Sequence, residues 1–356
     1  MELSELGWDS TWDSAFAPFA AEGLLPARAV TEDKHYYTLV SSDGPVLGQI
    51  AGKLIHRRQH NSALPKVGDW IGFRRPPASD RVSIEAVLPR RSSLSRKIPG
   101  REASGQVLAA NVDVALVVQA LDETLNFRRI ERFLVTALEG GARPVILLNK
   151  SDLHPDPDSV AEQVRTLAGQ HPVLVTSART GRAIPRIREF IPPGSTAVVL
   201  GTSGVGKSSL VNRLYGERVQ PTLPVRDSDS KGRHATTTRE LILLPGGGLI
   251  IDTPGLRELH LWLSETGLAD SFPDIVQIAA ACRFRDCKHE SEAGCAVRQH
   301  ATDGHLDSAR LQSFLKLQRE LQSVATRHRE HQWAVNRRRV RSGTRAHLLD
   351  DAPDDE

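Results

Sequence analysis

The sequence predicts a multidomain protein with a small all-β barrel first, a central α/β domain around a phosphate-binding loop, and a mostly helical C-terminal unit with a metal cluster. Three observations support this fold class: short strand-like runs between residues 27 and 98, alternating strand and helix patterns between 107 and 262, and three cysteines with a histidine between 282 and 295. A chain of 356 residues is long enough for two or three domains.

The composition is that of a soluble globular protein. Hydrophobic residues make up 39% of the chain and charged residues 25%, which is enough for a sizeable core. No apolar run approaches the roughly 20 residues that a membrane-spanning helix needs, and the first residues lack the basic and apolar regions of a signal peptide. We therefore expect a cytoplasmic protein without a membrane partner. The net charge of +3 does not by itself imply nucleic acid.

The N-terminal part is expected to hold a loosely attached leader over residues 1–26 and a barrel over 27–98. Glycine, proline and polar breaks separate the four strand-like runs HYYTLVSS, PVLGQIAG, KVGDWIGFRR and VSIEAVLP. The basic segment RRSSLSRKIPGREASGQ, residues 90–106, predicts a flexible linker, with the boundary between domains at 99–106.

The central part alternates between strand and helix signals. The runs VDVALVVQAL, RPVILLNK and HPVLVTSA predict strands, FRRIERFLVTALEGGA an amphipathic helix, and ELILLPGGGLIIDTPG a hairpin-like pair. This alternation favours a mostly parallel sheet in an α/β domain over 107–262. A helical domain with a basic, arginine-rich tail is expected over 263–345, followed by an acidic, disordered tail over 346–356.

The segment GTSGVGKSS matches the phosphate-loop pattern G-x4-G-K-[ST], and it follows an apolar run and precedes a helical pattern. The glycines let backbone N–H groups converge on phosphates, and the helix N-terminus adds its positive dipole end. We expect Lys207 to bridge the β- and γ-phosphates and Ser208 to bind Mg²⁺. The predicted contacts are Gly201, Thr202, Ser203, Gly204, Val205, Gly206, Lys207, Ser208 and Ser209.

Two segments downstream have the positions of nucleotide-sensing switches. In the second, DTPG follows an apolar strand, so Asp252 can hold Mg²⁺ through water and the Gly255 N–H can sense the γ-phosphate. The first, KGRHATTTREL, offers three consecutive threonines, 236–238, of which one would complete the Mg²⁺ shell. An ordinary polar loop is the alternative interpretation of this segment.

The segment Asn149-Lys150-Ser151-Asp152 predicts guanine recognition. The Asp152 carboxylate can accept hydrogen bonds from guanine N1–H and N2–H₂, whereas adenine would leave it unpaired. Asn149 would brace the loop, and the Lys150 stem would lie over the base. Ser177 and Ala178 follow another strand and suit a second base loop, in which the Ala178 N–H meets O6. No second NKxD or TKxD follows Asp252, where a conventional GTPase has it.

The motif order is therefore base loop, second base loop, phosphate loop, first switch and second switch. The usual order starts at the phosphate loop, so this chain is a circular permutation of it, which close domain termini allow. The second switch then leads directly into the C-terminal domain, and we hypothesise that nucleotide state is transmitted there. Leu256 stands where Ras-like enzymes have a water-orienting glutamine, which predicts slow intrinsic hydrolysis. His234 is the nearest candidate substitute, with a solvated loop histidine as the alternative.

The pattern C-x4-C-x-H-x5-C supplies three thiolates and one imidazole, from Cys282, Cys287, His289 and Cys295. This is the donor set of a tetrahedral structural zinc site. Such clustering in a cytosolic chain indicates metal rather than disulfides. Three buried free cysteines are the alternative.

These motifs, in the order NKSD, SA, GTSGVGKSS, GRHxTT, DTPG and C-x4-C-x-H-x5-C, resemble the RsgA (YjeQ/YloQ) family of circularly permuted GTPases. The stretches PKVGDWI, RRSSLSRK, LAANVDVAL and GCAV add to the resemblance, which covers roughly residues 27–325. It implies an N-terminal OB-fold barrel, a permuted GTPase domain and one structural zinc. It also implies Thr236 as a Mg²⁺ ligand and a catalytic role for His234, although Ala235 replaces the first of three threonines usual after that histidine.

The resemblance further implies a GTP hydrolase that binds the small (30S) ribosomal subunit and its 16S rRNA, and we expect the protein to be a monomer. Hydrolysis of GTP to GDP would be stimulated by the subunit and would couple factor release to late maturation. Two other functions are weighed: a nucleic-acid-binding scaffold with a static nucleotide, which intact Lys207, Ser208 and Asp252 disfavour, and a transporter or repair ATPase, which Asp152 disfavours.

RNA contacts are less specific in the sequence. Tyr36, Tyr37, Trp70 and Phe73 could stack on bases, with a place in the core as the alternative. The arginine-rich run 337–341 could contact RNA or be solvated. The basic residues that could contact phosphates are Arg57, Arg58, Arg74, Arg75, Arg90, Arg91, Arg96 and Lys97.

Overall fold

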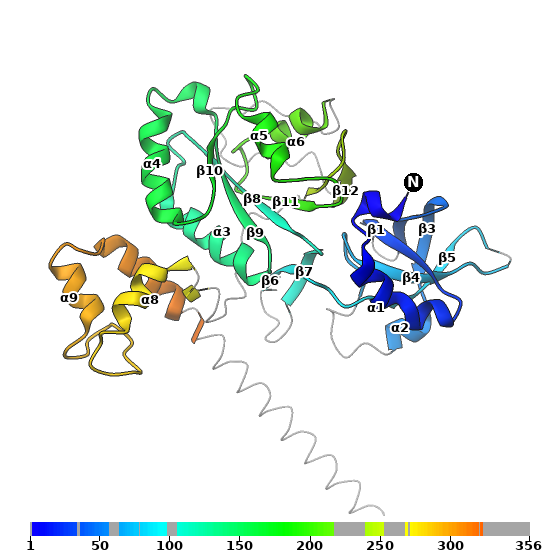
Figure 1. Cartoon of the computed structure of the whole chain (residues 1–356), viewed down its shortest axis with the longest axis horizontal. Coiled ribbons are helices and arrows are strands. Elements are labelled where there is room, and N and C mark those ends of the chain that lie inside the picture. Colours follow the sequence, from blue (N-terminus) through cyan, green and yellow to red (C-terminus); the bar gives the residue numbers. More distant parts are fainter. Residues whose placement is uncertain are drawn as a thin grey trace, which may run out of the picture.

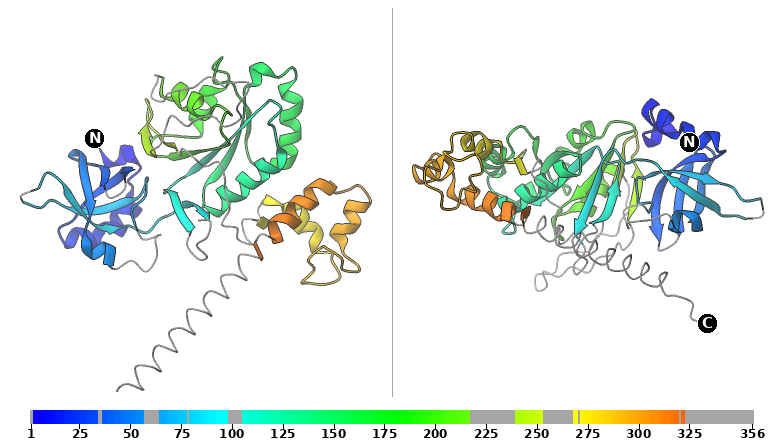
Figure 2. Two further views of the ribbon diagram at one scale, coloured as in Figure 1. Left: turned by 180° about the vertical axis from the view of Figure 1, so that it is seen from behind. Right: turned by 90° about the horizontal axis from the view of Figure 1, so that it is seen from below.

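The computed structural model has three parts, arranged along the molecule with the central domain between the other two (Figures 1 and 2). A barrel and a helical unit lie on opposite sides of a central α/β domain. The structure describes residues 2–33, 36–56, 64–77, 79–97, 105–216, 239–252, 268–269, 271–319 and 321–322.

The barrel confirms the predicted all-β fold. Its strands are β1 (Leu25–Asp33), β2 (Tyr36–Ser41), β3 (Gly44–Ile50), β4 (Trp70–Arg74) and β5 (Val82–Val87), with α2 (Gly52–His56) after β3. The strands follow the order β1-β2-β3-β5-β4, and pairing of β1 with β4 closes the barrel. Only the β3–β5 pair is parallel among these strands. A closed five-stranded barrel with this topology is an OB-fold.

The N-terminal segment is not a loosely attached leader, so that expectation was wrong. It forms η1 (Leu3–Leu6) and α1 (Ser10–Ala21), and α1 packs on the barrel. Trp12 and Phe16 are buried, and Trp8 lies edge-on to Trp70 with ring centroids 4.7 Å apart. Aromatic residues one helical turn apart bury one face of α1, and this spacing was visible in the sequence.

The central domain confirms the predicted mostly parallel sheet. Its strands follow the order β10-β9-β8-β11-β13-β12, and only β12 is antiparallel to its neighbour β13. The strand bounds are β8 (Val114–Ala120), β9 (Arg143–Asn149), β10 (Val173–Val175), β11 (Thr196–Leu200), β12 (Glu240–Leu243) and β13 (Leu249–Asp252).

Helices cover both faces of this sheet. On one face α3 (Phe127–Glu139) contacts β8 and β9 and lies beside α4 (Pro157–Ala168). On the other face lie α5 (Ile184–Glu189) and α6 (Lys207–Tyr215). Alternate residues of β8 belong to two separate hydrophobic clusters, one for each face. Every residue of the strand is therefore buried, and all of them except Gln119 are apolar, as expected of a strand covered on both sides.

The barrel joins the central domain through a continuous sheet, because β1 pairs with β12. Arg28 is buried at this junction, where it donates to the Gly68 carbonyl (3.3 Å), the Asn111 carbonyl (3.2 Å), the Thr196 hydroxyl (2.8 Å) and the Leu6 carbonyl. Gly68 has φ +92°, and an added Cβ would lie 2.1 Å from the Ala110 carbonyl oxygen. The junction therefore requires glycine there.

The predicted flexible linker is partly a β-ribbon, which corrects that expectation. Strands β6 (Ser93–Lys97) and β7 (Gly105–Ala110) pair antiparallel. Leu94, Leu108 and Ala109 join the large hydrophobic cluster that extends from the barrel through the central domain to the C-terminal unit. The basic and polar residues of the segment favoured a linker interpretation, because Leu94 is the one buried residue among the described side chains of β6.

The C-terminal unit is helical as predicted. It contains α8 (Pro273–Ala279), α9 (Ala296–Thr302) and a further helix described over 308–319. Its Arg310 and Ser313 reach the buried Glu131 of α3, with a guanidinium–carboxylate distance of 2.9 Å and a hydroxyl–carboxylate distance of 2.6 Å. These contacts join the unit to the central domain. Among the described residues, no helix is long and apolar enough to cross a membrane.

Candidate nucleotide-binding site and metal cluster

A cavity of about 590 Å³ lies where strands β9, β10 and β11 of the central sheet end. The carboxyl ends of parallel strands meet at one edge of a sheet, so loops that are distant in sequence converge there. The base loop, the second base loop and the phosphate loop all contribute to its wall. The lining residues are Asn149, Lys150, Asp152, Leu153, Ala178, Arg179, Gly206, Ser209, Asn212, Arg213 and Gly216.

Asn149 joins the three loops. Its side-chain amide donates to the Val205 carbonyl of the phosphate loop (Nδ2–O 2.8 Å) and accepts from the Ala178 N–H (3.0 Å). The residue is only 2% exposed, so both bonds are largely screened from bulk solvent, although Asn149 also borders the cavity. A single side chain therefore sets the spacing between the phosphate loop and both base loops.

Asp152 presents a carboxylate to the cavity. The Ser177 hydroxyl donates to its Oδ1 (2.5 Å), and the guanidinium of Arg179 lies 3.6 Å from its Oδ2. Ser177 is itself held, because its hydroxyl accepts from the Thr180 N–H (3.1 Å). An acceptor-only group fixed in this way suits the adjacent N–H donors of guanine. Sequence analysis did not single out Arg179, although it directly follows the second base loop.

Lys150 adopts a left-handed backbone conformation, with φ +62°. Its ammonium donates to Oδ2 of Asp122 in the loop after β8 (2.9 Å). Burial raises the pKa of the Asp122 carboxyl, but hydrogen bonds from Thr124 and Lys150 outweigh burial and hold that pKa below its usual value. Asp122 was missed because only the fold brings its loop beside the base loop.

The phosphate loop is shaped by its glycines. Gly206 has φ +96°, and a Cβ there would lie 2.3 Å from the Asn149 amide nitrogen. The Lys207 ammonium donates to the carbonyls of Gly201 (2.9 Å) and Thr202 (2.8 Å), which closes the loop on itself. Helix α6 begins at Lys207, so its N-terminal amides face the loop.

The magnesium site is only partly described. Asp252 ends β13 and is buried, close to the strand that precedes the phosphate loop. His234, Thr236 and Gly255 lie outside the described residues, as do residues 253–267, through which we expect nucleotide state to be transmitted.

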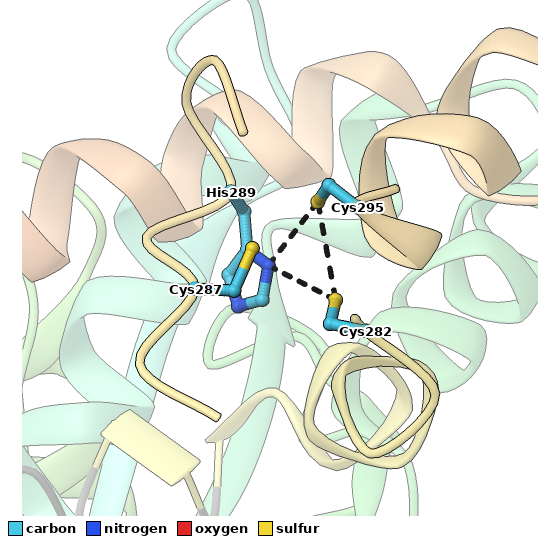
Figure 3. A group of neighbouring side chains, drawn as sticks. All are labelled: Cys282, Cys287, His289 and Cys295. Carbon is cyan, nitrogen blue, oxygen red and sulfur yellow. Dashed lines mark hydrogen bonds between the residues drawn. The ribbon is translucent and has the colours of Figure 1, made fainter. Parts of the chain in front are cut away.

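The predicted metal ligands converge in the C-terminal unit (Figure 3). The Cys282 and Cys295 sulfurs are 4.0 Å apart, and His289 Nδ1 lies 3.6 Å from the first and 3.4 Å from the second. All four ligand atoms, that of Cys287 included, lie within 4.8 Å of one another. Ligands about 2.0–2.3 Å from a tetrahedral zinc ion are about 3.5–3.8 Å apart, so the donor set and its spacing fit zinc. Burial lowers the pKa of His289, which favours the neutral imidazole that binds metal.

Comparisons of the sequence with known protein families and proteins support the same type of site. The sequence model of the RsgA GTPase family matches residues 87–262. The chain is 47% identical over 336 residues to the small ribosomal subunit biogenesis GTPase RsgA of Opitutus terrae, with 92% of each chain covered. The chain belongs to the RsgA GTPase family.

Other relatives extend the match. The RsgA of Syntrophotalea carbinolica is 44% identical, with 91% of each chain covered. The crystal structure of YjeQ from Thermotoga maritima is similar with a TM-score of 0.63 at 27% identity, covering 84% of this chain and 98% of that one. The RsgA resemblance inferred from the motifs is thus confirmed over nearly the whole chain.

In this RsgA family member, the structure shows which of the residues considered for RNA contact are buried and which are exposed. Tyr37, Trp70 and Phe73 are core residues, each at most 1% exposed, whereas Tyr36 is 38% exposed. Arg90 donates to the buried Asp69 carboxylate, at 2.7 Å from Oδ2. Arg57, Arg58 and the arginine-rich run lie outside the described residues.

Proposed function

We propose that this chain hydrolyses GTP to GDP and phosphate and that hydrolysis accompanies late maturation of the small ribosomal subunit. The observation that carries the proposal is the convergence of Asn149, Asp152 and the phosphate loop on one cavity despite their permuted order. Relatives named small ribosomal subunit biogenesis GTPase RsgA support the partner.

Within this proposal each residue has a stated task. Asp152 accepts from the guanine N–H groups, while the Ala178 N–H meets O6. Lys207 and the amides at the start of α6 bind the phosphates, and Ser208, Thr236 and Asp252 would hold Mg²⁺. The ion would supply charge neutralisation between the phosphates. His234 orients the attacking water in place of the glutamine that Leu256 replaces.

The remaining parts of the proposal concern the metal and the partner. Cys282, Cys287, His289 and Cys295 would hold one structural zinc ion, which would fix the fold of the loop between α8 and α9. The barrel and the C-terminal unit flank the GTPase domain (Figure 1), and we propose that both contact 16S rRNA. We propose a cytoplasmic monomer.

A specificity switch tests the base assignment. In Asp152→Asn the side-chain N–H would face the N–H donors of guanine, and two donors cannot form a hydrogen bond. The same N–H could donate to the C2 carbonyl oxygen of xanthine. We expect kcat/KM for GTP to fall roughly 100-fold and that for xanthosine triphosphate to rise. Asp158→Asn is the matched control, because Asp158 is exposed on α4. Unchanged GTP turnover in Asp152→Asn, or equal use of ATP by the parent protein, would contradict the proposal.

A further inference from the structure

Asp122 is the one carboxylate within 3 Å of the Lys150 ammonium in the described residues, and nothing in the sequence motifs assigns it a role. The pair is partly buried, with 24% of the Lys150 side chain and 22% of the Asp122 side chain exposed. Lys150 lines the base end of the cavity. Its side chain has many rotamers when free, so whatever fixes its ammonium also fixes the stem that faces the base.

Asp122 is itself fixed by its own loop. The backbone N–H and the hydroxyl of Thr124 both donate to its Oδ1, at 2.9 and 2.5 Å. This leaves Oδ2 to accept from Lys150. The carboxylate therefore has one oxygen committed to the loop and the other to the base-loop lysine.

The loop is in turn attached to the central sheet. The side-chain amide of Gln119, fully buried on β8, donates to the Thr124 carbonyl (3.0 Å), and Arg129 of α3 donates to the same carbonyl (3.3 Å). Hydrogen bonds thus run without a gap from a core strand through Thr124 and Asp122 to Lys150. A group held by such a chain is preorganised before its ligand arrives.

We propose that Asp122 is a positioning residue for guanine-nucleotide binding, which holds the Lys150 stem in place as one wall of the base slot. The inference rests on the proposed GTP-binding function of the cavity. Asp122 does not touch the nucleotide; it acts through Lys150. It therefore contributes to affinity for GDP and GTP alike and leaves the phosphate chemistry unchanged.

The test measures binding of N-methylanthraniloyl-GDP by fluorescence together with GTP turnover, using the full-length protein. For Asp122→Asn we expect Kd for the labelled GDP and KM for GTP to rise about five- to tenfold, with kcat unchanged. Glu123→Gln is the matched control, because it removes the same charge from the next, exposed residue of the loop. It should bind like the parent protein.

A double variant separates positioning from a merely structural role. Lys150→Met keeps the stem but removes the ammonium, so adding Asp122→Asn to it should change Kd less than twofold. An equal loss in both backgrounds, a lowered kcat, or tighter binding in Asp122→Asn would overturn the proposal. If the parent protein failed to bind the labelled GDP, the proposed function would fail instead, and the two failures are thereby distinguished.

Discussion

The bracing role of Asn149 makes the sharpest quantitative prediction. Asn149→Ala removes the bond to the Val205 carbonyl and the bond from the Ala178 N–H, which leaves both backbone groups unpaired. Each unpaired buried group costs about 1–3 kcal/mol. Because the adjoining cavity lets water recover part of this, we expect nucleotide binding to weaken by about 2–3 kcal/mol. That corresponds to a Kd roughly 30- to 150-fold higher.

The assay is titration with a fluorescent GDP analogue, with thermal unfolding as the check on the fold. Asn149→Asp separates the two bonds, because a carboxylate still accepts from Ala178 but cannot donate to Val205. It should fall between the parent protein and Asn149→Ala. Gln163→Ala, which removes an exposed amide on α4, is the matched control. A Kd for folded Asn149→Ala within threefold of the parent value would refute the bracing argument.

Three other predictions concern the metal and the two junctions. The purified protein should contain one zinc ion per chain by elemental analysis, and Cys295→Ala should lose it; full zinc in that variant would contradict the ligand set. Arg28→Met should lower the free energy of unfolding in urea by about 2–6 kcal/mol, since it leaves at least two buried acceptors unpaired at about 1–3 kcal/mol each, and a loss below about 1 kcal/mol would contradict this. Burial raises the pKa of Glu131, so its carboxylate form is disfavoured in the folded state. The stabilising contribution of Glu131 should thus be full below its unfolded pKa and decline as pH rises through the raised value, and Glu131→Gln should flatten this part of the pH profile of stability.

Long apolar runs and phosphate-loop chemistry made the central domain predictable from sequence. Strand β8 is buried on both faces and has Gln119 as its one polar residue, so its apolar pattern is clear in the sequence. Strand β1 was harder to predict from the sequence, because Arg28 lies near its middle. An arginine is usually exposed, and this one is buried by the junction between the two domains. Helix α1 was missed for a different reason: its aromatic residues have helical spacing in the sequence, but the surface that they cover is known only once the barrel is in place.

The candidate site likewise contains residues that the sequence identifies and residues that only the structure identifies. Motif residues such as Asp152 and Lys207 have tasks that local spacing reveals. The partners that hold them, Asp122 for Lys150 and Val205 for Asn149, are set by strand order and cannot be read from local pattern. The circular permutation illustrates this difference. It changes the order of the loops along the chain, but the order of the strands in the sheet remains that of a nucleotide-binding sheet and brings the loops together.

The most direct test of the central claim is steady-state release of phosphate from GTP, measured with and without purified small ribosomal subunits and with ATP as the control nucleotide. We expect slow turnover of GTP alone, marked acceleration by small subunits but not by large ones, and no turnover of ATP. Acceleration would justify His234→Ala as the next variant. GTP turnover that small subunits leave unchanged would contradict the claim that this GTPase acts on the maturing small subunit.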